Sequence, residues 1–434
     1  MKDIQDCIGD AGRRRGWAVV ALLFVFMLIN WADKAVIGLS AVPIIRELHL
    51  THTQFGLVGS AFFLLFPISG VIGGFLVNRM RSKPVLAAMA VIWALAQLPM
   101  AGMVGLQTLL ASRIVLGLGE GPALPIALHA VYKWFDDKRR AWPTSIVITG
   151  APFGAGVIAP LIVLIIVHYS WHTAFAALGV AGLAWAVAWL AIGREGTAGQ
   201  APAPGATQPV PAAAESIAYR RLIFSRTALG VFLAGFAAYW VLTLNVIWLA
   251  GYLIQAAGFK QAQVGWIVAL PALAQILLGP AISLASQKLT LLGLPNRLAR
   301  GGLGGLCVVI SGGAMVLMPL LKSAAAEIAM VTLAFSICGI IFPLGATLIG
   351  EITPTPQRGA MLGIMNSVQT VAGLLAPIIM GRLVDLGANP AAGFRSGFVM
   401  AGVFVLVCGL LGAWLMHPES DRRRLGLAEA AQPA

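Results

Sequence analysis

The chain has 434 residues, of which 59% are hydrophobic and only 10% charged, and its mean hydropathy is +0.89. This composition excludes an ordinary water-soluble globular domain and indicates an integral membrane protein. The net charge of +13 raises the alternative of a nucleic-acid-binding protein, which the positions of the basic residues have to decide.

Twelve segments of mainly apolar residues follow one another along the chain, each about twenty residues or longer. They lie near 17–40, 54–77, 84–104, 106–131, 142–168, 171–193, 227–255, 262–287, 297–320, 325–350, 360–386 and 393–416. None shows the alternating polarity of a membrane-spanning strand, so helices are the remaining way to satisfy the backbone in lipid. The sequence therefore predicts an all-α, multi-pass membrane protein.

The basic residues gather on one side of the predicted membrane. The N-terminal tail, residues 1–16, and every second loop hold most of them; the opposite side carries only Arg46, Lys260, Lys322, Arg382 and Arg395. The positive-inside rule therefore predicts that both termini are cytoplasmic. The apolar run after "RRRGW" contains charges and extends past the length of a signal peptide, so we expect an uncleaved first helix. The excess of basic residues is explained by their cytoplasmic location and by their attraction to anionic lipid headgroups. We therefore expect no nucleic acid partner.

Four ionisable residues lie inside the predicted helices: Asp33 and Lys34 in the first, and Arg113 and Glu120 in the fourth. Each would cost about 2.5–3.5 kcal/mol at a helix centre, so they must face water or one another. Arg113 and Glu120 are two turns apart, within about 20° of one face. Asp33 and Lys34 point about 100° apart and cannot pair directly. The four line a central cavity or, alternatively, form ion pairs that only hold the helices together.

A cation beside a buried carboxyl group can couple an anion to a proton. Burial raises the pKa of a carboxylic acid, and a neighbouring cation lowers it. When an anionic substrate takes the cation, the carboxylate loses its counter-ion and binds a proton more readily, so substrate and proton bind with positive coupling. This is the minimum physics of proton–anion symport.

The segment 194–226 is rich in Ala, Pro and Gly and reads as a cytoplasmic linker between six-helix halves at 17–193 and 227–416. Residues 417–434 form a cytoplasmic C-terminal tail. The two halves echo each other, because "GVIAP" in the fifth helix recurs as "GLLAP" in the eleventh. Parallel repeats of this kind predict a substrate site between the halves and alternating access.

Features of enzymes and metalloproteins are missing from the sequence pattern. The four cysteines have no metal-ligand spacing, and "RGGLGGL" lacks the strand and lysine of a phosphate-binding loop. We therefore expect no enzyme activity, no metal and no cofactor other than the proton as coupling ion.

Several motifs carry a family resemblance over the whole chain. The loop "GGFLVNRMRSK", with Asn78 and Arg79, and the loop "GEITPTPQRG", with Glu351 and Arg358, resemble the gating loops of the major facilitator superfamily. Asn78 stands where that family has Asp. The segments "NWADKA", "RIVLGLGEGPALP", "YKWFDDKRRA", "GAPFGAGVIAPL" and "SWHTAFAALGVAG" more narrowly resemble its anion:cation symporter family. The resemblance implies the major facilitator fold, with two pseudo-symmetric six-helix bundles.

The resemblance also implies roles for single residues. Asp33 and Glu120 would be the proton-linked acids, and Arg113 would help to hold the anion. Asn366, in "GIMNS", matches a substrate-contacting asparagine of sugar-acid carriers. Further residues placed where they can line the cavity or pack in the core are Lys34, Trp31, Phe66, Tyr239 and Asn245.

Several positions depart from the sugar-acid carriers. Lys34 replaces an arginine and so lacks the bidentate fork, Trp31 and Phe66 replace tyrosines, and His172 replaces an arginine. The cavity therefore has fewer groups that bind hydroxyls, which favours a less hydroxylated carboxylate.

The resulting prediction is a monomeric proton-coupled importer of a small organic anion in the plasma (inner) membrane. One alternative is a proton-driven exporter of drugs or metabolites, whose helix 5 motif "GAPFGAG" fits only in part. Another is a transport-inactive membrane sensor.

Overall fold

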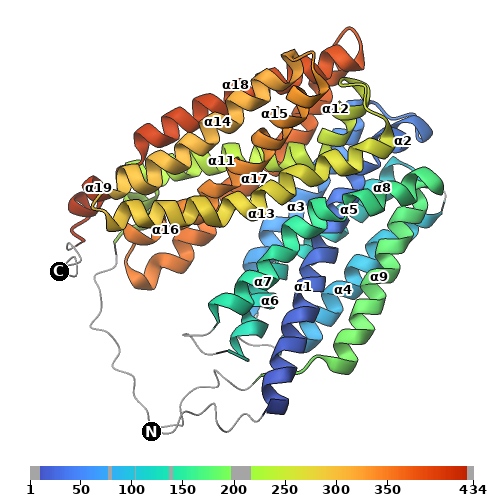
Figure 1. Ribbon diagram of the computed structural model, residues 1–434. Coiled ribbons are helices and arrows are strands. Elements are labelled where there is room, and N and C mark those ends of the chain that lie inside the picture. The colour runs from blue at the N-terminus through green and yellow to red at the C-terminus, as the bar shows by residue number, and fades with distance from the viewer. Residues whose placement is uncertain (1–9, 77–80, 103, 136–139, 197–216, 428–434) are drawn as a thin grey trace. The chain divides into compact units, whose positions relative to one another are not determined.

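The computed structural model describes residues 10–76, 81–102, 104–135, 140–196 and 217–427. Within them the regular elements are all helical (Figure 1), and twelve spans are long and apolar enough to cross a membrane. The predicted all-α fold with twelve transmembrane helices is therefore confirmed. Most of the predicted linker lies outside the described residues.

The first half of the chain forms a series of helices that begins before the apolar run. The helices are α1 (Asp10–Leu39), α2 (Ala41–Glu47), α3 (His52–Leu76), α4 (Ser82–Gln97), α5 (Leu106–Glu120), α6 (Ala123–Tyr132), α7 (Ala141–Pro152), α8 (Ala159–His168) and α9 (Trp171–Ile192). A short 3₁₀-helix at Leu98–Ala101 follows α4, and a short π-helix at Phe153–Val157 follows α7. Because α1 begins at Asp10, it extends into the tail that the sequence predicts at 1–16.

The second half is built in the same way. Its helices are α10 (Tyr219–Ile223), α11 (Arg226–Ile247), α12 (Leu249–Gln255), α13 (Gln261–Leu291), α14 (Leu303–Leu317), α15 (Ala324–Ile337), α16 (Ile341–Glu351), α17 (Arg358–Asp385), α18 (Pro390–Leu415) and α19 (Pro418–Arg424). A short π-helix lies at Arg297–Gly302, and short 3₁₀-helices lie at Met318–Leu320, Cys338–Ile340 and Thr355–Gln357.

The helices form two compact units. Unit 1 comprises Met1–Leu50, Leu57–Ala206 and Lys260–Ala269, and unit 2 comprises Thr51–Gly56, Thr207–Phe259 and Leu270–Ala434. The first residues of α3 therefore belong to unit 2 and those of α13 to unit 1. The sequence prediction divides the chain only at its linker, into 17–193 and 227–416. It does not assign Thr51–Gly56 to unit 2 or Lys260–Ala269 to unit 1.

Within unit 1, α1 packs on α7 and α9, and α4 packs on α5 and α9. The close approach of α5 to α3 depends on Gly117, because a Cβ atom there would collide with the carbonyl oxygen of Phe62. Small residues allow such close helix packing in membranes. This contact brings the aromatic residues of α3 next to the charged face of α5.

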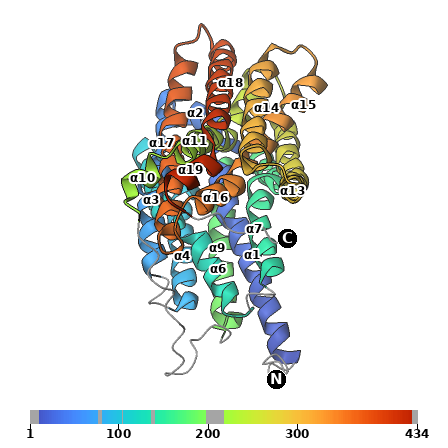
Figure 2. The ribbon, with the colours of Figure 1, turned by 90° about the vertical axis from the view of Figure 1, so that its left-hand side faces the viewer.

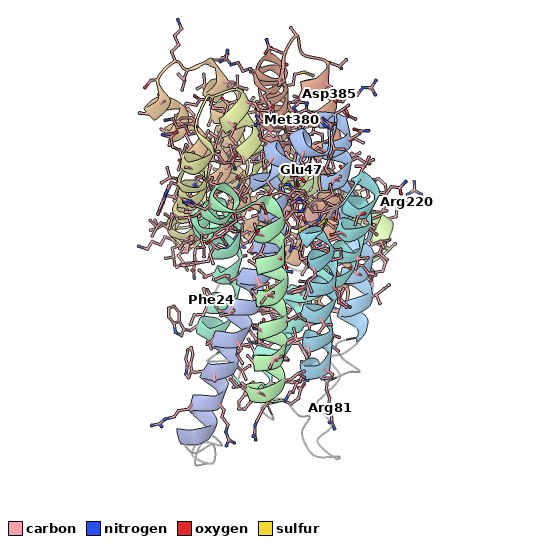
Figure 3. All side chains as sticks on the ribbon, turned by 90° about the vertical axis from the view of Figure 1, so that its right-hand side faces the viewer. Phe24, Glu47, Arg81, Arg220, Met380 and Asp385 are labelled. Atoms are coloured by element: carbon pink, nitrogen blue, oxygen red, sulfur yellow. The ribbon has the colours of Figure 1, made fainter. Side chains whose placement is uncertain are left out.

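One end of unit 1 is tied together by Glu47. Its carboxylate accepts hydrogen bonds from Trp171 Nε1 at 2.6 Å and from His172 Nε2 at 2.8 Å, which join α2 to α9. These donors hold the pKa of Glu47 below its ordinary value, with the bond from His172 as the largest cause. Glu47 and Arg81 lie at opposite ends of the unit (Figure 3).

Within unit 2, α14 lies along α18, and α11 packs on both α17 and α18 (Figure 2). The predicted helix at 227–255 is divided at Trp248, between α11 and α12. The buried indole of Trp248 donates to the carbonyl oxygen of Pro377 at 2.9 Å. Near it, Asp385 accepts from the backbone N–H groups of His52 and Thr53 at 3.0 and 2.7 Å, so this carboxylate caps the start of α3.

Candidate functional site

The charged residues of α1 and α5 meet inside unit 1. The ammonium of Lys34 pairs with the carboxylate of Glu120, and the exposed fractions of the two side chains are 10% and 0%. Lys34 also donates to the side-chain oxygen of Asn30 at 2.7 Å, one turn earlier on α1. The cation thus holds a carboxylate and an amide oxygen, both of which an incoming anion can replace.

Aromatic rings surround this ammonium group. Its nitrogen lies 5.1 Å from the ring centroid of Trp31, 5.4 Å from that of Phe62 and 5.8 Å from that of Phe66. These distances fall within the range of cation–π attraction. The enclosure attracts the cation through ring faces and offers few hydroxyl or amide groups. The structure therefore brings together four residues that the sequence predicts for the site, Lys34, Glu120, Trp31 and Phe66.

The other two charges form a separate network. Arg113 donates to the backbone oxygen of Asp33 at 3.2 Å and to the side-chain oxygen of Gln97 at 2.8 Å. Gln97 in turn donates to the Asp33 carboxylate at 2.9 Å. Asp33 and Lys34 therefore turn to different partners, as their angular separation predicts. Arg113 is only 1% exposed, so its guanidinium group is covered in this conformation.

The remaining predicted binding residues belong to unit 2. Asn366 on α17 is exposed, and Tyr239 and Asn245 on α11 are half-buried. The ring of Tyr239 lies edge-on to Phe342, with centroids 6.2 Å apart. The side-chain oxygen of Asn245 is buried without a hydrogen-bond partner among the described residues, so it has an acceptor to offer.

The structure describes the predicted gating residues of only one of the two loop motifs. Asn78 and Arg79 lie outside the described residues. Glu351 pairs with Arg300 and accepts from Asn296 at 3.1 Å, whereas Arg358 donates to the backbone oxygen of Thr353 at 3.2 Å. Glu351 therefore ties the end of α16 to the connection before α14, a partner that the loop motif alone does not reveal.

Sequence reasoning missed Asn30, Gln97 and Phe62. Each is uncharged, so a search for ionisable residues passes over them. Asn30 stands one turn before Lys34 on the same face, and Gln97 is an amide in the otherwise apolar run of α4. A search for buried amides next to the four charges would have found both.

The described residues contain no group of three or more His, Cys, Asp or Glu side chains that could hold a metal ion. Three of the cysteines, Cys307, Cys338 and Cys408, are buried free thiols. The Lys34 site is built from one ion pair, an amide and aromatic rings.

Relatives of this chain are transporters of organic acids. It is 27% identical to the hexuronate transporter of Bacillus subtilis, covering 92% of this chain and 94% of that protein. It is 27% identical to a probable sulfoacetate transporter of Cupriavidus necator, covering 93% and 96%, and 26% identical to a D-galactonate transporter of Escherichia coli, covering 95% and 96%.

Solved structures share the fold. A bacterial homologue of the lysosomal transporter Spinster superposes with a TM-score of 0.75 at 19% identity, covering 94% of this chain and 98% of that one. A D-xylose–proton symporter gives 0.72 at 15% identity, covering 91% and 97%.

The family model of the Major Facilitator Superfamily matches residues 22–344 and 231–433. Together the two matches extend over nearly the whole described chain, and the relatives and solved structures above are transporters and not enzymes. The chain is an integral, multi-pass membrane protein that belongs to the Major Facilitator Superfamily of transporters.

Proposed function

We propose that this transporter imports a small organic anion together with protons across the plasma (inner) membrane, as a monomer with both termini in the cytoplasm. The observation that carries the proposal is the Lys34–Glu120 ion pair inside its aromatic enclosure. A substrate carboxylate competes with Glu120 for this one ammonium group. The named cargoes of the three relatives are organic acids, which supports an anionic substrate.

The coupling follows from the loss of a counter-ion. Once the substrate holds Lys34, the Glu120 carboxylate is left buried without its cation, and a buried carboxyl group without a cation favours the protonated form. Protonation removes the repulsion between Glu120 and the bound anion, so each ligand increases the affinity for the other. Asp33 is the second proton-linked acid, and the buried Arg113 adds positive charge to unit 1.

The energetics separate possible stoichiometries. Each pH unit supplies about 1.4 kcal/mol per proton, and the membrane potential supplies about 2.3 kcal/mol per net charge per 100 mV. One proton per monovalent anion is electroneutral and draws only on the pH gradient. Two protons, one on each acid, also draw on the potential.

The enclosure bears on the class of anion. Trp31, Phe62 and Phe66 surround the Lys34 ammonium with ring faces, which offer no hydrogen bonds to substrate hydroxyls. A polyhydroxylated acid needs such hydrogen-bond partners and is therefore disfavoured. The substrate is therefore a compact carboxylate with few hydroxyls.

Uptake by proteoliposomes under an imposed pH gradient tests the proposal, with a panel of labelled carboxylates that runs from acetate and benzoate to galacturonate. We expect concentrative uptake when the outside is acidic, and stronger uptake of the less hydroxylated acids. Efflux driven by an inward proton gradient would identify an exporter, and binding without any flux would identify a sensor; either result refutes import.

A further inference from the structure

An amide separates the second acid from the second cation of unit 1. Gln97, at the end of α4, donates from Nε2 to Asp33 Oδ1 at 2.9 Å and accepts at Oε1 from Arg113 Nη2 at 2.8 Å. Gln97, Asp33 and Arg113 are 0%, 1% and 1% exposed. Arg113 donates to the backbone oxygen of Asp33, and among the described residues it makes no ion pair with the Asp33 carboxylate.

The orientation of this amide follows from its partners. A guanidinium group only donates hydrogen bonds, so the oxygen of Gln97 must face Arg113 and its NH₂ group must face Asp33. An amide N–H can donate to a carboxyl oxygen whether or not the other oxygen carries a proton. A guanidinium in direct contact would instead strongly favour the ionised carboxylate. Gln97 therefore accommodates both protonation states of Asp33.

Protonation of Asp33 changes the balance of charge inside unit 1, because other charged groups lie near it. Those that act on it are Arg113 and Glu120 from α5 and Lys34 from α1. The elements packed around them add uncharged groups: α4 contributes Gln97, and α9 contributes Phe175, whose ring centroid lies 5.4 Å from the guanidinium carbon. While Lys34 pairs with Glu120, a proton on Asp33 leaves the charge of Arg113 uncompensated, and unit 1 then attracts an anion.

We infer that Gln97 is a positioning residue that holds the Asp33 carboxyl group away from the Arg113 guanidinium and so sets the pH at which Asp33 exchanges its proton. The inference rests on the proposed function, because it gives Asp33 a proton to exchange during import. In that cycle Asp33 binds a proton from the outside water as the anion enters and releases it to the cytoplasm.

Infrared titration of the purified full chain in lipid tests this inference without any substrate. The probe is the C=O band of a protonated carboxyl group, assigned to Asp33 by its loss in Asp33→Asn. In Gln97→Glu a second carboxylate lies beside Asp33, so the midpoint moves to higher pH. In Gln97→Met the guanidinium loses its amide acceptor and turns to Asp33, so the midpoint moves to lower pH. Each shift is about one pH unit, a tenfold change in proton affinity.

Ser112→Ala is the matched control. The hydroxyl of Ser112 donates to the backbone oxygen of Ala96 at 2.7 Å, beside Gln97, and joins α5 to α4, and among the described residues it makes no hydrogen bond to a charged side chain. A purely structural role for Gln97 predicts that Gln97→Met keeps the wild-type midpoint, and this result overturns the inference, as does a wild-type protein with no titrating Asp33 band. If Gln97→Met does not fold, Gln97→Leu, which also lacks the amide acceptor and adds no charge, takes its place. A wild-type protein that titrates as expected but carries no carboxylate refutes the proposed function only.

Discussion

Lys34 and Glu120 are ion-paired across α1 and α5 with almost no exposure of either side chain. Such a pair contributes little net stability, since desolvation offsets much of the attraction, but removal of one partner leaves an uncompensated buried charge. In the proposed import cycle, an anion can therefore take the place of Glu120 and a proton the place of Lys34 at a small net change in free energy.

Replacement of Glu120 by glutamine should abolish the contribution of its proton to accumulation. A glutamine binds no proton, so the concentration ratio that one pH unit supports falls by about tenfold for a single coupled proton. Exchange of labelled for unlabelled substrate needs no net proton movement and is retained in part. Proteoliposome assays of net uptake and exchange measure the two. Unchanged accumulation would remove Glu120 from the coupling mechanism.

Loss of the cation should affect stability and transport differently. Lys34→Met leaves Glu120 buried without a partner and destabilises the folded protein by about 3–5 kcal/mol, or less if Glu120 takes up a proton. The double variant Lys34→Met/Glu120→Gln removes both charges and recovers most of that stability, yet it binds no anion. Thermal unfolding in lipid and uptake of the panel carboxylates measure these effects.

Lys34→Arg serves as the control for that pair, because it retains the charge and so retains most of the stability. Substrate affinity in this variant reports on geometry alone. Equal uptake by the double variant and the wild type would contradict a role for Lys34 in binding the anion.

The Glu47 junction should give unit 1 a pH-dependent stability. The pKa of Glu47 is lowered below its ordinary value of 4.5, first by the hydrogen bond from His172 and then by that from Trp171. A group whose pKa is depressed by folding stabilises the protein above its unfolded pKa, and this stability is lost as the pH falls through the folded pKa. The unfolding temperature should therefore fall below about pH 4.5.

Glu47→Gln tests that assignment, because the amide does not titrate over this range. Its unfolding temperature should be lower than that of the wild type at neutral pH, and the difference should shrink as the solution is acidified. Glu195→Gln is a matched control, since Glu195 pairs with Lys133 at 2.7 Å elsewhere in unit 1 and makes no contact with His172. A difference for Glu47→Gln that is constant with pH would show that the junction does not depend on ionisation.

The sequence predicts some features of this structure well and others not at all, because they depend on different physical properties of the residues. The twelve spans follow from hydropathy, because lipid leaves the backbone no alternative to helices. The membership of Lys34, Glu120, Trp31 and Phe66 in one site follows from the cost of buried charge and from the family resemblance. The pairing of Lys34 with Glu120, rather than of Arg113 with either acid, depends on how the helices pack in three dimensions, which the spacing of apolar residues along the sequence does not specify. Asn30 and Gln97 carry no charge, so the cost of burying a charge identifies the four ionisable residues but not these two amides.

The aromatic enclosure should control which carboxylates are carried. Phe66→Tyr and Trp31→Tyr each place a hydroxyl beside the Lys34 ammonium, where it can bond to a hydroxyl of the substrate. One such bond contributes about 1 kcal/mol, so the ratio of kcat/KM for galacturonate to that for benzoate should rise by roughly five- to tenfold per substitution. Competition uptake assays in proteoliposomes measure this ratio directly. Phe224→Tyr is the control, because Phe224 is 66% exposed and lies in the other unit. If all three variants keep the wild-type ratio, the ring faces around Lys34 do not select the substrate, and the preference must arise from Tyr239, Asn245 or Asn366.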